Sequence, residues 1–261
     1  MKTILSASVK GGVGKTTVAV GLAQALQRRG FQVGILDLDY RAPCVPIVLN
    51  IEDATLARTD TDALVPVQVS GLHVFSMAFI WPAAKSVQVE DNDAAEDVHQ
   101  LLTPGIIAWP ELDFLVVDTP PTSSGIVRIA LESSDAAGAV IVSHPSRVSR
   151  ADTVRTLDLF SEKQVPVFGM VSNQGTDEEG RKRYDLDDQS LNDLAAQYQL
   201  PWCFCIPHTR NLEPYFDSLA LALLNTQPVL LPKPKEPKGV AWDRIIAVAQ
   251  TLKGSTPSGQ R

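Results

Sequence analysis

Short apolar runs alternate with longer amphipathic segments along most of the chain. The runs are rich in Val, Ile and Leu, and such near-continuous apolar stretches are typical of strands that are buried on both faces. They lie at 3–8, 32–39, 72–77, 114–118, 139–143, 167–173 and 202–206. Because segments with helical character separate them, the pattern predicts an α/β protein, a mostly parallel sheet with helices on both faces.

Helices are predicted between these strands, at 16–30, 124–133, 149–162 and 185–198. The first is rich in alanine and leucine, has no internal proline, and ends with Arg28, Arg29 and Gly30, which are helix stop signals. Residues 52–65 and 83–98 are polar without clear periodicity, so we expect them to form excursions over the surface.

The C-terminal part has its own pattern. A proline-lysine connector, 232–239, leads to a segment whose apolar residues share one helical face. Those residues are Trp242, Ile245, Ile246, Ala249 and Leu252. The polar face is only weakly basic, so packing on the sheet is favoured over a membrane anchor. We expect one domain over 1–252 and a disordered tail over 253–261.

Composition and charge narrow the class of protein. A chain of 261 residues with 44% apolar and 20% charged residues can bury a sizeable core. The net charge of −7 gives no footprint for broad nucleic-acid binding. No apolar run approaches the roughly 20 residues of a membrane span, and the start of the sequence has no secretory pattern, so a cytoplasmic protein is expected. The three cysteines do not suggest a disulfide framework.

The strongest chemical signal is SVKGGVGKTT, residues 8–17, between the first predicted strand and helix. Glycines let backbone N–H groups surround phosphate oxygens, and the following helix N-terminus favours an anion. Lys15 is expected to reach the β- and γ-phosphates of a nucleotide, and the Thr16 hydroxyl is expected to ligate Mg²⁺. The residues assigned to nucleotide binding here are Gly11, Gly12, Val13, Gly14, Lys15, Thr16 and Thr17.

Two residues of this stretch depart from the usual pattern. G-x-x-x-x-G-K-[ST] begins with glycine where this chain has Val9, which fits if the loop enters in an ordinary β conformation. Lys10 is a surplus lysine, and K-G-G-x-G-K-T-T resembles the deviant Walker A motif of the ParA/MinD superfamily. In that superfamily the early lysine reaches the partner's nucleotide across a dimer interface. The resemblance therefore implies that Lys10 acts catalytically in trans; the alternative is a solvated surface lysine.

Strand-end acids complete the site that the resemblance implies. ILDLD, 35–39, is similar to the switch I segment, with Asp39 orienting the attacking water and Asp37 supporting the Mg²⁺ region. LDFLVVDTPP, 112–121, is similar to Walker B and switch II, with Asp118 holding Mg²⁺ through water. The same superfamily places an asparagine and a proline loop against adenine, which implies this role for Asn173 and Pro207. Acids, Asn and Pro at such positions can also be caps or ordinary loop residues.

The resemblance extends over nearly the whole chain and narrows to Mrp-type ATPases. LDYRAPCVPIVL, WPELDFLVVDTPP and VPVFGMVSN look like Mrp segments in Mrp order. Members of that branch bind ATP as dimers and carry or help to assemble iron–sulfur clusters. The resemblance implies ATP and Mg²⁺ as cofactors, a homodimer formed on ATP binding, and a client protein.

Two departures from the Mrp pattern bear on the cargo and on signalling. The C-x-x-C pair that follows the asparagine segment is absent, and the only close pair, Cys203 and Cys205, lies in a predicted strand. Such cysteines share one face, and we expect them, like the lone Cys44, to be structural rather than cluster ligands. The family's P-P-G-T-G-D has become PPTSSG, so its acid is lost and switch II is expected to signal differently.

The favoured function is an Mrp-like ATPase that acts as a dimeric molecular switch. A ParA/MinD-type positioning or partitioning ATPase is a second hypothesis; it would need a basic surface or a basic amphipathic C-terminal helix, and neither is evident in the sequence. A nucleotide-dependent adaptor with little hydrolysis is a third, and the altered switch II segment supports it. A small-molecule kinase is disfavoured, because Lys10 would then have no obvious role.

Overall fold

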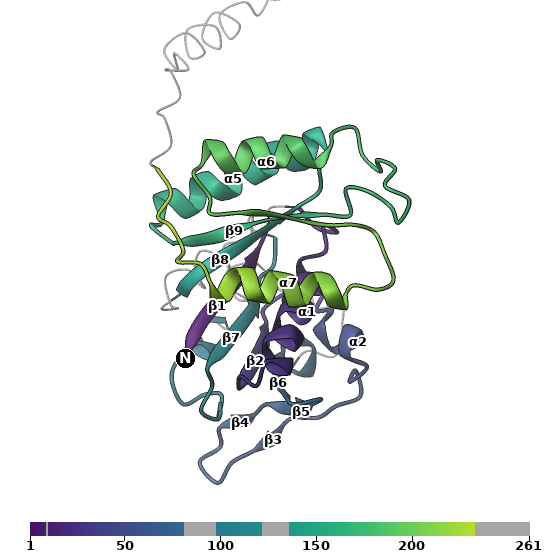
Figure 1. The fold of residues 1–261 in the computed structure, drawn as a ribbon. Helices are drawn as coiled ribbons and strands as arrows, with labels where there is room; N and C mark the ends of the chain where they lie inside the picture. The colour runs from purple at the N-terminus through teal and green to yellow at the C-terminus, as the bar shows by residue number, and fades with distance from the viewer. Residues whose placement is uncertain (9, 81–97, 122–135, 233–261) are drawn as a thin grey trace, which may run out of the picture.

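The computed structural model describes residues 1–8, 10–80, 98–121 and 136–232 (Figure 1). Several sequence predictions fall outside these ranges. They are the helix at 124–133, most of the excursion at 83–98, the C-terminal helix, the tail, and the conformation of Val9.

An eight-stranded sheet forms the centre of the protein, in the order β10-β9-β8-β1-β7-β2-β6-β5. Its strands are β1 (Lys2–Ala7), β2 (Val33–Asp37), β5 (Val67–Val69), β6 (Leu72–Ser76), β7 (Phe114–Asp118), β8 (Ala136–Ser143), β9 (Val167–Asn173) and β10 (Cys203–Ile206). Every neighbouring pair is parallel except β5 with β6. The prediction of a mostly parallel sheet is therefore confirmed.

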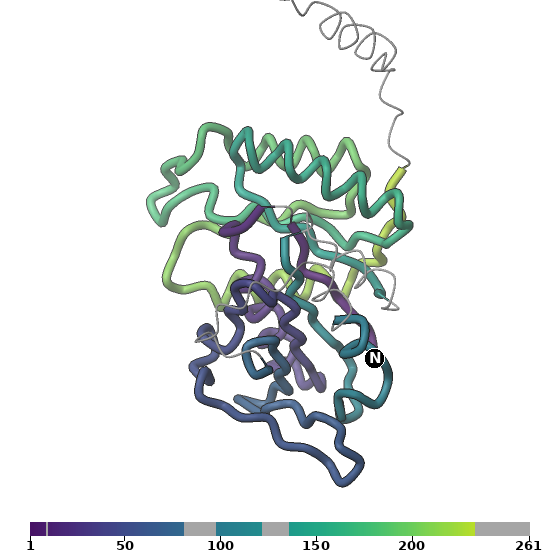
Figure 2. Tube along the Cα trace, turned by 180° about the vertical axis from the view of Figure 1, so that it is seen from behind, coloured from purple at the N-terminus to yellow at the C-terminus, as the bar shows by residue number. Residues whose placement is uncertain are grey.

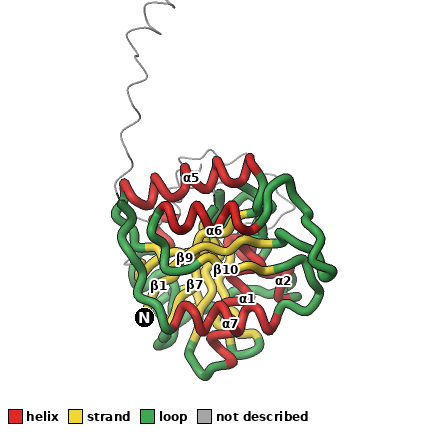
Figure 3. The backbone as a smooth tube through the Cα atoms, turned by 45° about the horizontal axis from the view of Figure 1, so that its top comes forward, coloured by secondary structure: helices red, strands yellow, loops and turns green. Residues whose placement is uncertain are grey.

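Helices cover both faces of this sheet. They are α1 (Lys15–Arg28), α2 (Val45–Leu49), α5 (Arg147–Glu162), α6 (Asp188–Gln197), α7 (Glu213–Leu224) and the 3₁₀ turn η1 (Met77–Phe79). Figures 1 and 3 show α5 and α6 side by side on one face and α1 and α7 on the other. α1 ends close to its predicted stop signals, because Gly30 takes a φ of 90° and donates its N–H to the Gln27 carbonyl.

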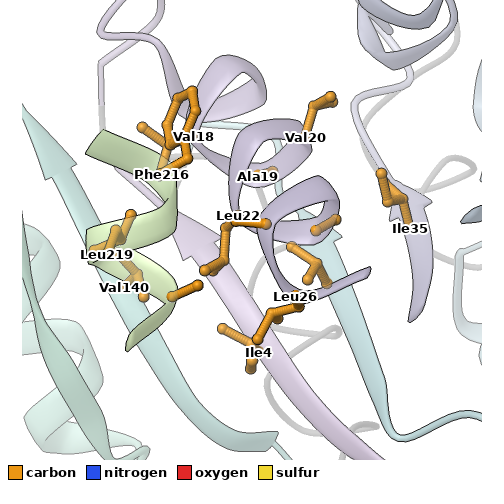
Figure 4. Close-up of a cluster of buried hydrophobic side chains, with 14 of the residues drawn as sticks. Ile4, Val18, Ala19, Val20, Leu22, Leu26, Ile35, Val140, Phe216 and Leu219 are labelled. Atoms are coloured by element: carbon orange, nitrogen blue, oxygen red, sulfur yellow. The ribbon is translucent and has the colours of Figure 1, made fainter. Parts of the chain in front are cut away.

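Side-chain alternation along the strands divides the core in two. Ile4, Ile35 and Val140 pack under α1 and α7, whereas Leu5 and Leu36 belong to the cluster beneath α5 and α6. Successive strand residues point to opposite faces, so an apolar run without alternation supplies both layers. Figure 4 shows the first cluster, in which Leu22 and Leu26 of α1 and Phe216 and Leu219 of α7 meet the strands.

The sequence analysis missed α7. Its buried residues, Phe216, Leu219, Ala220 and Leu223, follow helical i, i+3, i+4, i+7 spacing, and Pro214 lies in its first turn, where proline is tolerated. The signal was therefore present in the sequence. The helix closes the face that α1 alone leaves uncovered.

Two hairpins, the short helix α2 and the turn η1 were also not predicted. β5 pairs antiparallel with β6 through Ser70 and Gly71, which both have positive φ, as a two-residue type I′ turn requires. Within the excursion at 52–65, β3 (Ala57–Arg58) and β4 (Leu64–Val65) form a separate small hairpin. Figures 1 and 2 show this hairpin projecting from the end of the molecule where β5 and β6 lie.

Candidate functional site

The glycine loop joins the end of β1 to the start of α1, as predicted. Gly12 and Gly14 have φ values of 78° and 90°, in the region that favours glycine. A Cβ on Gly14 would lie 2.3 Å from the Asn173 amide nitrogen, so the position also lacks space for a side chain. No acid lies in the first turn of α1, which leaves the positive end of the helix dipole for an anion.

Lys15 is buried beneath this loop, with 7% of its surface exposed. Burial lowers the pKa of its ammonium group, while Asp118 and Asp39 oppose that shift. A buried cation is stable only beside opposite charge. The surroundings of Lys15 therefore fit a polyanionic ligand, and the nearby acids would hold a cation that accompanies it.

Two of the predicted acids lie side by side at the carboxyl ends of neighbouring strands, because Asp37 of β2 is in register with Asp118 of β7. Both are buried. Burial, followed by the charge of Asp118, raises the pKa of Asp37 to about 8. Its carboxylate accepts hydrogen bonds from the Asp39 N–H at 3.0 Å, the Val45 N–H at 3.2 Å and the Ser76 hydroxyl at 2.9 Å. Asp37 thus fastens the loop from Asp39 to α2 onto β6.

Asp118 keeps one oxygen unpartnered. Its Oδ2 accepts a hydrogen bond of 2.5 Å from the Thr16 hydroxyl, but its buried Oδ1 has no partner. Burial raises the pKa of this carboxyl to about 7, and the Thr16 bond opposes the shift. A hydroxyl and a carboxylate with a spare oxygen are hard oxygen donors of the kind that Mg²⁺ prefers, directly or through water. Thr16 and Asp118 therefore fit the predicted magnesium site.

Asp39 is less buried than Asp37 and Asp118, and its charge acts on both Lys15 and Asp118. Its side chain is partly buried, and its Oδ1 accepts hydrogen bonds from the backbone N–H groups of Arg41 and Ala42. This turn gives the loop a defined shape before α2. Lys10 lies at the same edge of the sheet and is exposed, and its carbonyl accepts a 2.8 Å hydrogen bond from the Ser8 hydroxyl.

The two residues predicted to flank adenine meet at the ends of β9 and β10. Asn173 is in register with Ile206, and Pro207 follows directly, partly buried. Asn173 is itself buried, and its amide donates a 2.8 Å hydrogen bond to the Val13 carbonyl. One of its donors therefore supports the glycine loop, a role that the sequence did not reveal.

The cysteines differ from the expectation in one respect. Cys203 is partly buried on β10, but Cys205 is exposed, so it is not a core residue. β10 is an edge strand, which leaves its outer flank open. Burial raises the pKa values of these thiols to about 12 and about 11. Cys44 donates to the Ala42 carbonyl beside switch I, and within the described ranges no group of three or more His, Cys, Asp or Glu side chains could hold a metal ion.

The comparison with known families agrees with this geometry. The ParA family described as NUBPL iron-transfer P-loop NTPase matches residues 1–233. The chain belongs to the ParA family of P-loop NTPases. Among curated relatives, an iron-sulfur cluster carrier protein from Deinococcus radiodurans is 32% identical over 254 residues, which cover 96% of this chain and 69% of that protein.

Solved structures place the chain in the same fold. A nucleotide-binding protein from Archaeoglobus fulgidus, in complex with ADP, superposes with a TM-score of 0.69 at 28% identity, covering 88% of this chain and 93% of that one. The cell division ATPase MinD from Pyrococcus furiosus shares the fold, with a TM-score of 0.61 at 21% identity and coverage of 98% and 99%. No helix in the described part of this ParA-family chain has the length and apolar character to cross a membrane.

The site also contains residues that the sequence analysis did not single out. Ser76 supports Asp37, and its signal was a polar residue in the predicted strand at 72–77. His144 lies just beyond β8, buried with 8% of its surface exposed. Its signal was a histidine directly after an apolar strand, at the same sheet edge as the glycine loop.

Proposed function

We propose that this ParA-family protein is an ATPase that binds Mg²⁺ and ATP at the glycine loop and dimerises on binding ATP. The observation that carries the proposal is the group formed at the N-terminus of α1 by Lys15 and Asp118, which are buried, and Thr16, which is partly buried, with one carboxylate oxygen left unpartnered. A buried cation, a hydroxyl and a spare oxygen match the parts of a Mg²⁺–nucleoside triphosphate.

Each residue of the site has its own role in binding or hydrolysing the nucleotide. Backbone N–H groups of the glycine loop hold phosphate oxygens, and Lys15 neutralises their charge. Thr16 and Asp118 hold Mg²⁺, which supplies charge stabilisation at the phosphates. Asp37 keeps the switch I loop in place, and Asp39 on that loop orients the attacking water. Asn173 and Pro207 flank adenine in this proposal, and Asn173 also supports the glycine loop.

Lys10 completes the site of a second protomer in this proposal. It is exposed, whereas Lys15 is buried, so the two lysines of the loop have different surroundings. A cation that arrives from outside can stabilise charge on the transferring phosphoryl group, as an arginine finger does. Hydrolysis would then depend on the dimer.

The cargo is proposed from the relatives, whose names describe iron–sulfur cluster carriers. Clusters are held by thiolates, commonly four of them. In the described part of this chain, Cys203 and Cys205 are the closest pair in sequence, and their raised pKa values mean that a cluster would have to displace both protons. We propose that the protein transfers iron–sulfur clusters. The thiols of Cys203 and Cys205 are the candidates for contact with the cluster.

The nucleotide site is tested with Lys15→Ala. Loss of a buried phosphate contact in a loop of neutral donors should weaken ATP binding at least about tenfold and abolish turnover. Fluorescent-nucleotide titration and phosphate release measure the two quantities, with Lys163→Ala, a lysine at the far end of α5, as the matched control. Unchanged affinity and turnover in a folded Lys15→Ala protein would overturn the assignment.

A further inference from the structure

His144 is a buried histidine that the proposed mechanism leaves without a role. It follows β8 directly, and its ring stacks on Tyr184 with centroids 4.6 Å apart and planes 23° from parallel. Its Nε2 is buried and has no hydrogen-bond partner. A buried polar atom without a partner is uncommon and calls for an explanation, such as a bound water or a group that arrives in another state.

Hydrogen bonds fix the segment 184–186, which packs against His144. The Leu186 N–H donates to the Pro145 carbonyl, and the Arg147 N–H donates to Asp185 at 3.2 Å. These bonds tie the segment that carries Tyr184 to the turn between β8 and α5. The position of Tyr184 against the His144 ring is therefore fixed by hydrogen bonds between the residues that follow each of them in sequence.

Sheet register places His144 beside the first lysine of the glycine loop. β1 and β8 are parallel neighbours, and Ala7 is paired with Ile141. Lys10 lies three residues after Ala7, and His144 lies three residues after Ile141. Both segments leave the sheet at the same edge. Their nearness agrees with the electrostatics, because burial, then Lys10 and then Arg183 lower the pKa of His144 to about 4.

A neutral imidazole suits a lysine neighbour. At neutral pH His144 carries no charge to repel an ammonium group, and one of its ring nitrogens is an acceptor. Lysine is a flexible point charge with three donors, so its direction depends on the acceptors near it. Arg183 is already engaged, since it donates to Gln174 at 3.1 Å and lies over the Tyr184 ring.

We infer that His144 is a positioning residue for Lys10: its Nε2 accepts a hydrogen bond from the Lys10 ammonium group and directs that group toward the nucleotide of the partner protomer. The inference rests on the proposed function, because it requires Lys10 to act in trans. The inference adds His144, a residue outside the glycine loop, to the trans action of Lys10. Tyr184 contributes by stacking on the imidazole and limiting its rotation.

His144→Phe is the test variant, because phenylalanine keeps a ring to stack on Tyr184 and removes the acceptor. We expect turnover to fall about tenfold with the KM for ATP unchanged, since nucleotide binding within the same protomer is intact. His144→Gln, which restores an acceptor, should regain part of the turnover. His73→Phe, a histidine on β6, is the matched control and should keep wild-type turnover.

Mixing experiments show in which protomer His144 acts. In a mixed dimer of His144→Phe with Asp39→Ala, one site has an intact Asp39 and receives Lys10 from the subunit that retains His144. At a one-to-one ratio such dimers should give about one quarter of the wild-type rate, because half of the dimers are mixed and each has one complete site. Lys10→Ala mixed with Asp39→Ala serves as the reference, with mixed dimers confirmed by capture on a tag carried by one subunit.

The outcomes distinguish the role of His144 from the trans role of Lys10. Recovery in both mixtures supports the inference. Recovery for Lys10→Ala but not for His144→Phe would show that His144 serves its own protomer, and would overturn the inference while leaving the proposed function intact. No recovery in either mixture would overturn the trans role of Lys10 and the inference with it. Wild-type turnover in His144→Phe would overturn the inference alone and leave the trans role of Lys10 standing. If that variant melts early, His144→Leu is tested in the same way.

Discussion

At the scale of single residues, the site buries polar and charged groups in a way that folding alone disfavours. Two carboxyl groups are buried in register, and one oxygen of Asp118 has no partner. Both features cost stability in the free protein. A bound magnesium ion would offset both, so these residues are better explained by ligand binding than by folding.

This cost leads to a prediction about pH. Folded Asp37 and Asp118 hold their protons to about pH 8 and about pH 7, whereas unfolded aspartate releases its proton near 3.8. The folded state therefore binds more protons between these values, and stability that is present at pH 4 is lost as the pH rises through 7 and 8. Thermal melting of the nucleotide-free protein across this range measures the slope.

Asp118→Asn should reduce that slope. The amide keeps an oxygen for the Thr16 hydroxyl and removes one of the two buried charges. At pH 8 we expect the nucleotide-free variant to be more stable than wild type by about 1 kcal/mol, roughly 2–4 °C in Tm, with the gain vanishing near pH 4, where unfolded aspartate is also protonated. Magnesium-dependent turnover should be lost. A variant less stable than wild type at pH 8 would show that charge repulsion is not the dominant cost.

At the scale of elements, the packing of α7 against α1 supports the helix that provides two residues of the site. α1 supplies Lys15 and Thr16, and α7 packs along it through Phe216. Gly21 lies at the crossing, where an added Cβ would be 2.2 Å from the Phe216 ring. Glycine is used here for close approach of a helix to an aromatic ring, since its φ is not in the left-handed region.

Gly21→Ala should therefore destabilise the protein although alanine is the better helix former. Helix propensity favours alanine by about 1 kcal/mol, but overpacking a buried contact costs about 1–3 kcal/mol. We expect a net loss of about 1 kcal/mol in urea unfolding, partly recovered in Gly21→Ala/Phe216→Leu, where the smaller side chain makes room. If Gly21→Ala alone raises the unfolding midpoint, the helices can separate more freely than the packing indicates.

At the scale of the whole molecule, the proposed carrier role leads to a prediction about bound iron. Protein purified without oxygen should contain iron and sulfide and absorb in the visible range, with a content that changes on adding ATP. Cys203→Ser/Cys205→Ser should lose at least half of that iron if these thiols contact the cluster, with Cys44→Ser as the matched control. Full iron content in the double variant would place the cargo elsewhere, and no iron in any preparation would contradict a carrier role.

The sequence by itself determined the features of this protein that depend on residues close together in the chain. A strand, a glycine loop and a helix are consecutive, so the nucleotide-binding loop needs no distant information, and apolar runs between helices predict a parallel sheet because its strands are buried on both faces. α7 had a readable signal that was overlooked. The aspartates at the strand ends were identified from the resemblance of their segments to switch I and Walker B.

Only the tertiary structure decided which distant residues meet. Strand order sets Asp37 beside Asp118, Asn173 beneath Val13, and His144 next to the start of the glycine loop. It also makes β10 an edge strand and so exposes Cys205. Sequence patterns report the period and burial of each element, but strand order depends on how whole elements pack together, and the pairings that give this site its chemistry follow from that order.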